Sequence, residues 1–180
     1  MKKTTILLML ILTVFCFSSV FGTDRPPINV NLIIDGSSSL EEVKAEIIPW
    51  LNGRLDQVLV NGDRVTVWLA ETTVRVLFSG TVNNQADKEA VKEQIRGISG
   101  SASTPDFAGA LRAAAGLSSP SFSYTLLISA SPENLSSVLS GPQANHLRFS
   151  RIQEFSTWRA VIVGLNLDAR VQRAARAFMN

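Results

Sequence analysis

The sequence predicts an α/β fold, in which a single doubly wound, mostly parallel sheet carries one antiparallel edge hairpin and helices on both faces. Short apolar segments alternate with longer segments of helical periodicity, which is typical of strands joined by crossover helices. Three of the apolar segments are almost continuous, as expected for strands covered on both sides. Two others are separated by only a few residues, and so short a link indicates an antiparallel pair because a parallel return needs a crossover.

The first 22 residues are expected to be a signal peptide rather than part of the fold. Lys2 and Lys3 form a positive start, a run of twelve mostly apolar residues follows, and Gly22 ends a compact stretch suited to cleavage. The apolar run is shorter than the roughly 20 residues of a membrane-spanning helix. We therefore expect residues 1–22 to be removed and residues 23–180 to form one secreted or periplasmic domain with no stable membrane span. An uncleaved N-terminal anchor stays open as the alternative.

The charged residues argue against a nucleic-acid-binding surface. The chain has 17 Lys and Arg against 15 Asp and Glu, and loss of the two lysines of the signal segment leaves 15 of each. No segment interleaves clustered Lys and Arg with aromatic residues, as a nucleic-acid groove requires. The one cysteine, Cys16, lies in the signal segment, so the processed chain has neither disulfides nor thiol chemistry. Its hydrophobic core must suffice alone, which about 158 residues allow.

A buried strand and a long helix are expected to open the domain. Residues 28–34 are apolar, β-branched and bounded by Asp-Gly, which is typical of a strand. Residues 40–59 have apolar side chains near helical spacing, with Ser38 or Ser39 as the cap and two glutamates in the first turn. Pro49 is expected to kink this helix or split it in two.

The remaining elements alternate in the same way. The edge hairpin is expected to pair strands at 64–70 and 73–78. The next helix, at 85–98, is expected to turn four residues inward, namely Ala86, Ala90, Val91 and Ile95. The later elements are a helix at 105–117, a strand at 124–129, a broken helical segment at 132–155, a strand at 158–165 and a closing helix at 168–179. The three tryptophans are expected in the core: Trp50, Trp68 and Trp158.

Four oxygen-bearing residues are expected to meet at one edge of the sheet. In doubly wound sheets, ligands bind beyond the carboxyl ends of the strands, where the strand order reverses. That rule selects three loops here, at residues 35–39, 100–106 and 129–133. The first presents Asp35, Ser37 and Ser39, and the second presents Thr104 immediately before a helix. One carboxylate and three hydroxyls form a low-charge oxygen set of the kind that Mg²⁺ binds while it keeps some waters.

The loop at the end of the first strand also carries a family resemblance. Residues 33–40, Ile-Ile-Asp-Gly-Ser-Ser-Ser-Leu, resemble the D-x-S-x-S start of von Willebrand factor type A domains. Thr104, followed by Ala110-Leu111, is similar to the second metal-site element of that family, and Gly62-Asp63-Arg64-Val65 is also similar to it. The resemblance covers essentially the whole processed chain, in the right order. It implies a Rossmann-like fold and a role in adhesion or complex assembly.

The resemblance further implies how such a domain binds. In the family pattern, Asp35, Ser37, Ser39 and Thr104 hold Mg²⁺ or Mn²⁺, and the ion bridges to an acidic residue of a protein partner. We therefore interpret the chain as a protein-interaction module of this type, without enzymatic activity. The only histidine, His146, has neither a nucleophile motif nor a ligand cluster near it in the sequence. The identity of the partner and the oligomeric state do not follow from the sequence.

One position departs from the family pattern. The family usually places an Asp after the fourth strand, whereas Ala130 stands there and removes one negative charge near the ion. A metal-free scaffold or accessory subunit with the same fold is therefore an alternative, and a small metal-dependent hydrolase that also uses Asp106 is another. In the plainest interpretation, Asp35 and Ser37 form an ordinary strand-to-helix turn and Thr104 is a helix N-cap.

Overall fold

The computed structural model describes residues 25–117, 123–131, 133–135, 138 and 158–164, the last stretch by its backbone alone. The expected signal peptide, His146, the closing helix and most of the broken helical segment lie outside the described residues. Within the described ranges, no helix has the length and apolar character needed to cross a membrane.

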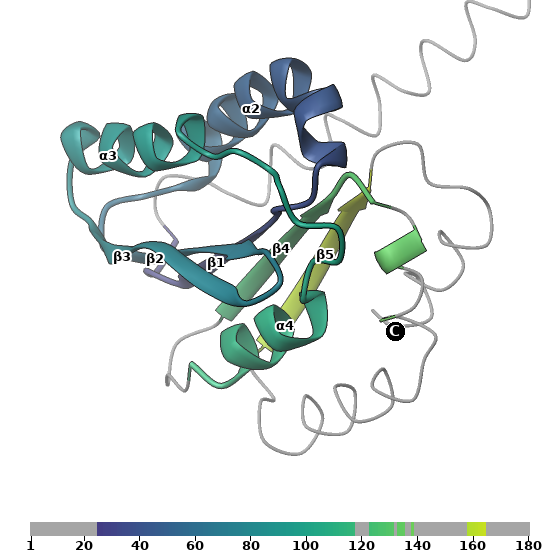
Figure 1. Ribbon diagram of the computed structural model, residues 1–180. Helices are drawn as coiled ribbons and strands as arrows, with labels where there is room; N and C mark the ends of the chain where they lie inside the picture. The colour runs from purple at the N-terminus through teal and green to yellow at the C-terminus, as the bar shows by residue number, and fades with distance from the viewer. Residues whose placement is uncertain (1–24, 118–122, 132, 136–137, 139–157, 165–180) are drawn as a thin grey trace, which may run out of the picture.

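One five-stranded sheet, with the strand order β3-β2-β1-β4-β5, forms the centre of the structure (Figure 1). The strands are β1 (Asn29–Asp35), β2 (Asp63–Ala70), β3 (Val74–Val82), β4 (Ser123–Ser129) and β5 (Trp158–Gly164). β1 pairs in parallel with β2 and β4, β4 pairs in parallel with β5, and β3 is antiparallel to β2 at the edge. The predicted fold class, a mostly parallel sheet with one edge hairpin, is confirmed.

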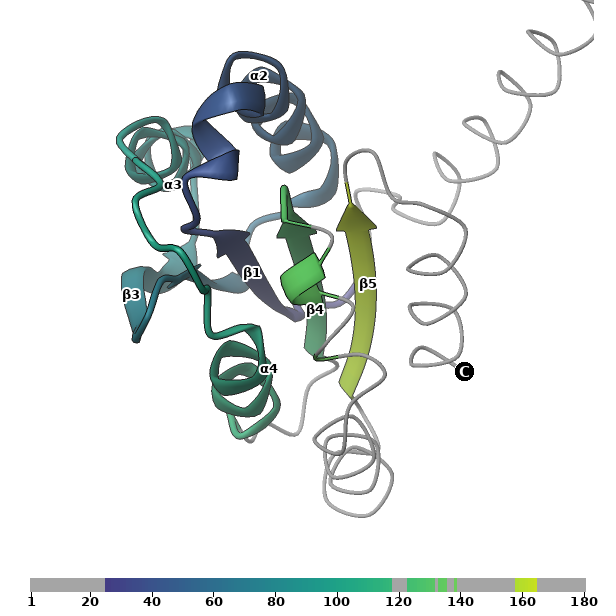
Figure 2. The ribbon, with the colours of Figure 1, turned by 45° about the vertical axis from the view of Figure 1, so that its right-hand side comes forward.

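Helices cover both faces of this sheet. They are α2 (Ser39–Val58), α3 (Gln85–Arg96) and α4 (Phe107–Ala115). α2 and α3 lie on one face and α4 lies on the other (Figure 2). Leu32 and Ile34 of β1 belong to the buried cluster that includes residues of α2 and α3, whereas Ile33 packs with Phe107 of α4. Both sides of the central strand are therefore covered, which explains why its sequence is almost continuously apolar.

The predicted split of the helix at Pro49 does not occur. α2 is one continuous helix of 20 residues, and Pro49 lies on its exposed face. Ser38 occupies the N-cap position, but its side chain makes no capping hydrogen bond. The prediction that Trp50 lies in the core is also wrong. Trp50 shares the exposed face of α2, is 39% exposed, and has the guanidinium of Arg54 at 5.8 Å from its ring centroid.

The inward face of α3 differs from the predicted one. Val91 and Ile95 are buried as expected, whereas Ala86 and Ala90 are exposed. α3 packs against α2 as well as against the sheet, so its second covered side is the one that carries Lys92. The Lys92 ammonium lies 2.7 Å from a carboxylate oxygen of Asp56 on α2 and 2.6 Å from one of Glu89. A buried lysine paired at its tip replaces the predicted alanine contact.

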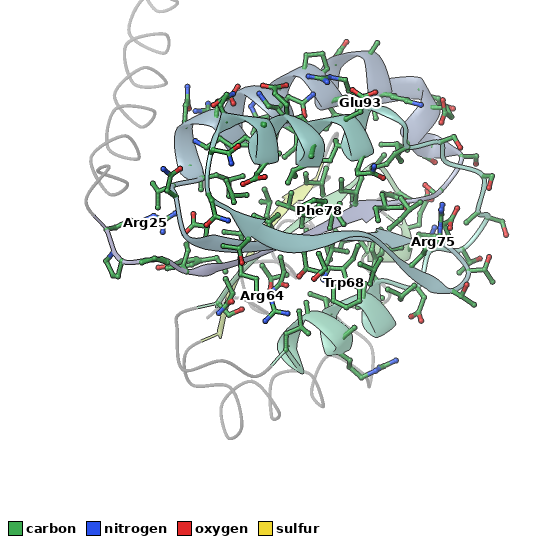
Figure 3. The ribbon with its side chains drawn as sticks, turned by 90° about the vertical axis from the view of Figure 1, so that its left-hand side faces the viewer. Arg25, Arg64, Trp68, Arg75, Phe78 and Glu93 are labelled. Atoms are coloured by element: carbon green, nitrogen blue, oxygen red, sulfur yellow. The ribbon has the colours of Figure 1, made fainter. Side chains whose placement is uncertain are left out.

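α4 starts two residues later than predicted and is capped by a different residue. The N-cap is Asp106, whose carboxylate accepts the Gly109 N–H at 2.7 Å. The interpretation of Thr104 as the N-cap is therefore wrong. Trp68 of β2 is buried on the α4 side of the sheet, as predicted for the core, and Phe78 of β3 lies on the α3 side (Figure 3).

The buried Asp63 is the first residue of β2 and lies at the edge of the sheet where the parallel strands begin, called the amino edge below. Asp63 is fully buried, and Arg25 donates from Nη1 to its Oδ1 at 2.8 Å. The backbone N–H groups of Ile28 and Val60 also donate to the Asp63 carboxylate, both at 2.9 Å. The Gly-Asp-Arg-Val segment that resembles the family thus fastens the start of β1 and the end of α2 to β2.

Candidate functional site

The candidate site lies where the strand order reverses. β1 lies between β2 and β4 in the sheet, and the chain crosses from β1 to β2 on one side and later to β4 on the other. The carboxyl end of β1 is therefore the topological switch point of the sheet. Asp35 is the last residue of β1, and Ser129 is the last residue of the neighbouring β4. The topology therefore places the predicted loops at one edge, called the carboxyl edge below.

Asp35 is fully buried and both of its carboxylate oxygens accept hydrogen bonds. Oδ1 accepts the Ser37 N–H at 2.8 Å. Oδ2 accepts the Ala130 N–H at 2.7 Å and the Ser131 hydroxyl at 2.6 Å, and the Ser129 hydroxyl lies further away, at 3.3 Å. Such bonds to an ionised acceptor offset the desolvation of the buried charge. Asp35 therefore fastens the loop after β1 to the loop after β4.

Ser37 lies at the meeting point of two loops and has an unused oxygen. Its side chain is only 2% exposed, and its Oγ has no hydrogen-bond partner. Its backbone forms an isolated parallel bridge with Ala102. Gly100 makes this approach possible, since a Cβ there would lie 1.9 Å from the Ser37 carbonyl oxygen. Ser37 is thus an acceptor enclosed between Asp35 and the 100–102 loop.

Ser39 and Thr104 lie at the same edge but in different surroundings. Ser39 is the first residue of α2 and is half-buried, whereas Thr104 is exposed just ahead of the α4 cap. Among the hydrogen bonds between described residues, none joins either hydroxyl to Asp35. Of the four predicted site residues, Asp35 and Ser37 are in direct contact and the other two flank them.

A fourth loop belongs to the carboxyl edge and was missed by sequence reasoning. It is the link of the β2–β3 hairpin, which begins at Glu71. The Gly36 N–H donates to the Ala70 carbonyl at 2.9 Å, and the Asp106 N–H donates to the Glu71 carbonyl at 2.7 Å. A Cβ at Gly36 would lie 2.6 Å from Glu71 Cγ, so this approach needs glycine. A long helix separates β1 from β2 in the sequence, which is typical of parallel strands, so the carboxyl end of β2 could have been assigned to the same edge.

The hydrogen bonds of these residues bear on the predicted site for Mg²⁺ or Mn²⁺. Both oxygens of Asp35 already have protein donors, and Ala130 presents an N–H where the family's Asp adds an acceptor. Nowhere in the described part of the chain do three His, Cys, Asp or Glu side chains gather closely enough to hold a metal ion. The one feature that suits an ion is the unpartnered Ser37 Oγ.

No protein-family model matches the sequence, and no curated protein matches it. Several solved structures are similar to this chain in fold. A von Willebrand factor type A protein from Catenulispora acidiphila is 15% identical with a TM-score of 0.63, over 86% of this chain and 37% of that one. The manganese-loaded TRAP protein of Plasmodium vivax is 16% identical with a TM-score of 0.61, over 84% and 62%. The pilus adhesin SpaC of Lactobacillus rhamnosus GG is 11% identical with a TM-score of 0.62, over 87% and 28%.

These likenesses concern the fold. The chain has a von Willebrand factor A-like fold, which confirms the resemblance carried by residues 33–40. It spans less than two thirds of the length of each of the three structures, from 28% to 62%.

Proposed function

We propose that this chain is a secreted or periplasmic protein-interaction module that binds a protein partner through the loops of its carboxyl edge, without a bridging metal ion. The observation that carries the proposal is the hydrogen bonding of Asp35. Four donors from the chain itself engage this carboxylate, so the central acid of the edge is used to hold two loops in fixed positions. A set of fixed loops on a rigid sheet is a surface suited to recognition.

The structural likenesses support an interaction module. One of the similar structures is a pilus adhesin, and another has been solved as a manganese-loaded TRAP protein. The exposed residues of the carboxyl edge include Glu41 in the first turn of α2 and Thr104 in the loop before α4. Backbone hydrogen bonds of Ala102 with Gly36 and Ser38 join this loop to the segment that leads into α2. Partner binding would therefore need little rearrangement of this surface.

Site-specific photo-crosslinking in cells of the source organism tests the proposal. A photoreactive residue at Thr104 samples the carboxyl edge, and one at Thr81, equally exposed but near the amino edge on β3, is the matched control. We expect a discrete protein adduct from position 104 and none from position 81. Adducts from position 81 alone, or from neither position, would refute the carboxyl edge as the binding surface.

A metal-bridged form of the same function is the second candidate, and the buried, unpartnered Ser37 Oγ favours it. In that form, Asp35, Ser37, Ser39 and Thr104 would hold Mg²⁺ or Mn²⁺, and the bound ion would supply the link to a partner carboxylate. The thermal midpoint of the processed chain distinguishes the two forms. A rise with millimolar Mn²⁺ supports the metal-bridged form, whereas a rise that appears only in Ala130→Asp supports the metal-free form.

Export and cleavage after Gly22 complete the proposal. The positive start and short apolar run of residues 1–22 support it. Intact-mass analysis of the protein recovered outside the cytoplasm should show Thr23 as the first residue. A recovered chain that keeps residues 1–22 would instead support the uncleaved anchor.

A further inference from the structure

We propose that the group which the carboxyl edge binds is cationic, a lysine or arginine side chain of the protein partner, and not a carboxylate. This inference rests on the proposed function and specifies the partner chemistry of the same edge. Two observations carry it, the distribution of charge along the edge and the free acceptor at its centre.

The carboxyl edge is acidic although the processed chain is balanced. The described residues at this edge include six carboxylates, namely Asp35, Glu41, Glu42, Glu71, Asp106 and Glu133. They include two cations, and each is already paired within the chain. Lys44 lies 3.7 Å from Glu41, and Arg75 lies 3.1 Å from Glu71. An excess of negative charge therefore remains for an external partner.

Two of these carboxylates flank the Ser37 segment. Glu41 accepts the Gly100 N–H at 2.7 Å and lies on the side of the 100–102 loop. Glu71 lies on the opposite side, where its Cγ closes over Gly36. Their side chains are 45% and 25% exposed, so both reach solvent. The buried Ser37 Oγ between them adds an acceptor without a donor.

The groups of this edge match the ammonium of a lysine or the guanidinium of an arginine better than they match a metal ion or a partner carboxylate. Lysine and arginine side chains carry only donors, and the exposed groups on either side of Ser37 are carboxylates, which only accept. In the described ranges the acids are too widely spaced to enclose a metal ion together, but a flexible basic side chain needs no such convergence. A partner carboxylate would instead meet like charge, which opposes binding.

Peptide titration of the processed chain, followed by amide resonances in NMR spectra, tests this inference. The probes are tetralysine and tetraglutamate at low ionic strength with a chelator present. We expect tetralysine to shift the amide signals of Ser37, Gly100 and Ala102, and to lose its effect as salt is added. The double variant Glu41→Gln with Glu71→Gln should bind tetralysine about fivefold more weakly. Glu46→Gln, an exposed acid in the middle of α2, is the matched control and should leave the affinity unchanged.

The other outcomes overturn the inference. They are shifts spread evenly over the surface, equal weakening by Glu46→Gln, or binding of tetraglutamate that appears on addition of Mg²⁺ or Mn²⁺. Unchanged spectra of the two variants outside the edge exclude misfolding as the cause. A crosslink from position 104 together with no tetralysine binding refutes only the cationic partner, whereas loss of both refutes the proposed function as well.

Discussion

Two buried aspartates at opposite edges of the sheet, Asp63 and Asp35, are stabilised in different ways. Asp63 at the amino edge is neutralised by Arg25, which Figure 3 shows at the opposite end of the sheet from Arg75. Asp35 at the carboxyl edge receives only uncharged donors, from the backbone and from serine hydroxyls. Both carboxylates join segments that are distant in the sequence, but only Asp63 has a charged partner. The amino edge is thus held together by an ion pair, and the carboxyl edge is held together by hydrogen bonds from uncharged donors.

The largest expected effect is that of Asp63→Ala. It removes the carboxylate that pairs with the mostly buried Arg25 guanidinium and accepts the Ile28 and Val60 N–H groups. Loss of one partner from a buried ion pair costs about 3–5 kcal/mol. Urea denaturation of the processed chain measures it. A loss under about 1 kcal/mol would contradict the role of Asp63, and Arg64→Ala, an exposed neighbour, is the control.

Asp35→Ala is expected to destabilise the domain less, by about 2–3 kcal/mol, because only neutral donors lose their acceptor. The structural effect should be local, because the variant lacks the two bonds, from the Ala130 N–H and the Ser131 hydroxyl, that hold the loop after β4 to β1. Hydrogen exchange at Ala130 and Ser131 should accelerate more than at the β2–β3 pairing. An equal acceleration across the whole sheet would mean that Asp35 acts as a general structural residue like Asp63.

A third charged cluster, away from both edges, is expected to matter less. Hydrogen bonds to Asp56 first and to Glu89 second raise the pKa of Lys92 above its ordinary value of 10.5. Both acids are about half exposed, so water weakens their pairing with Lys92. The substitution Lys92→Met should therefore lower the free energy of unfolding by about 1 kcal/mol. Because the folded-state pKa is raised, this stability is fully present below pH 10.5 and lost as the pH rises through the raised value. The difference between natural chain and variant should therefore shrink above pH 10.5 in urea denaturation, and a pH-independent difference would contradict the ion-pair account.

Local sequence patterns predict the framework of this molecule better than the contacts at its carboxyl edge. The nearly continuous apolar run of β1 and the Asp-Gly that ends it predict a buried strand and the place of Asp35, and the short link after β2 predicts the hairpin. These features can be predicted because they depend on neighbouring residues. The bond from the Ala130 N–H to Asp35 joins residues 95 positions apart and involves a backbone group, so no side-chain pattern signals it. The inward turn of Lys92 depends likewise on where α2 lies. Ala130 was predicted to weaken the site as a missing acid, and the structure adds that its backbone supplies a donor in the same place.

The smallest expected effect is that of Ser37→Ala, and it separates the two forms of the carboxyl edge most directly. Ser37 Oγ is buried and has no hydrogen-bond partner, so the substitution removes a hydroxyl without breaking a hydrogen bond. The free energy of unfolding should therefore stay within about 0.5 kcal/mol of that of the natural chain, on the stable side, although Asp35→Ala two residues away is costly. In the presence of millimolar Mn²⁺ the same comparison tests the metal. If the natural chain gains stability from the ion and Ser37→Ala does not, Ser37 Oγ is an ion ligand, and the metal-free edge is refuted. If neither protein gains stability, the metal-free form of the edge is supported.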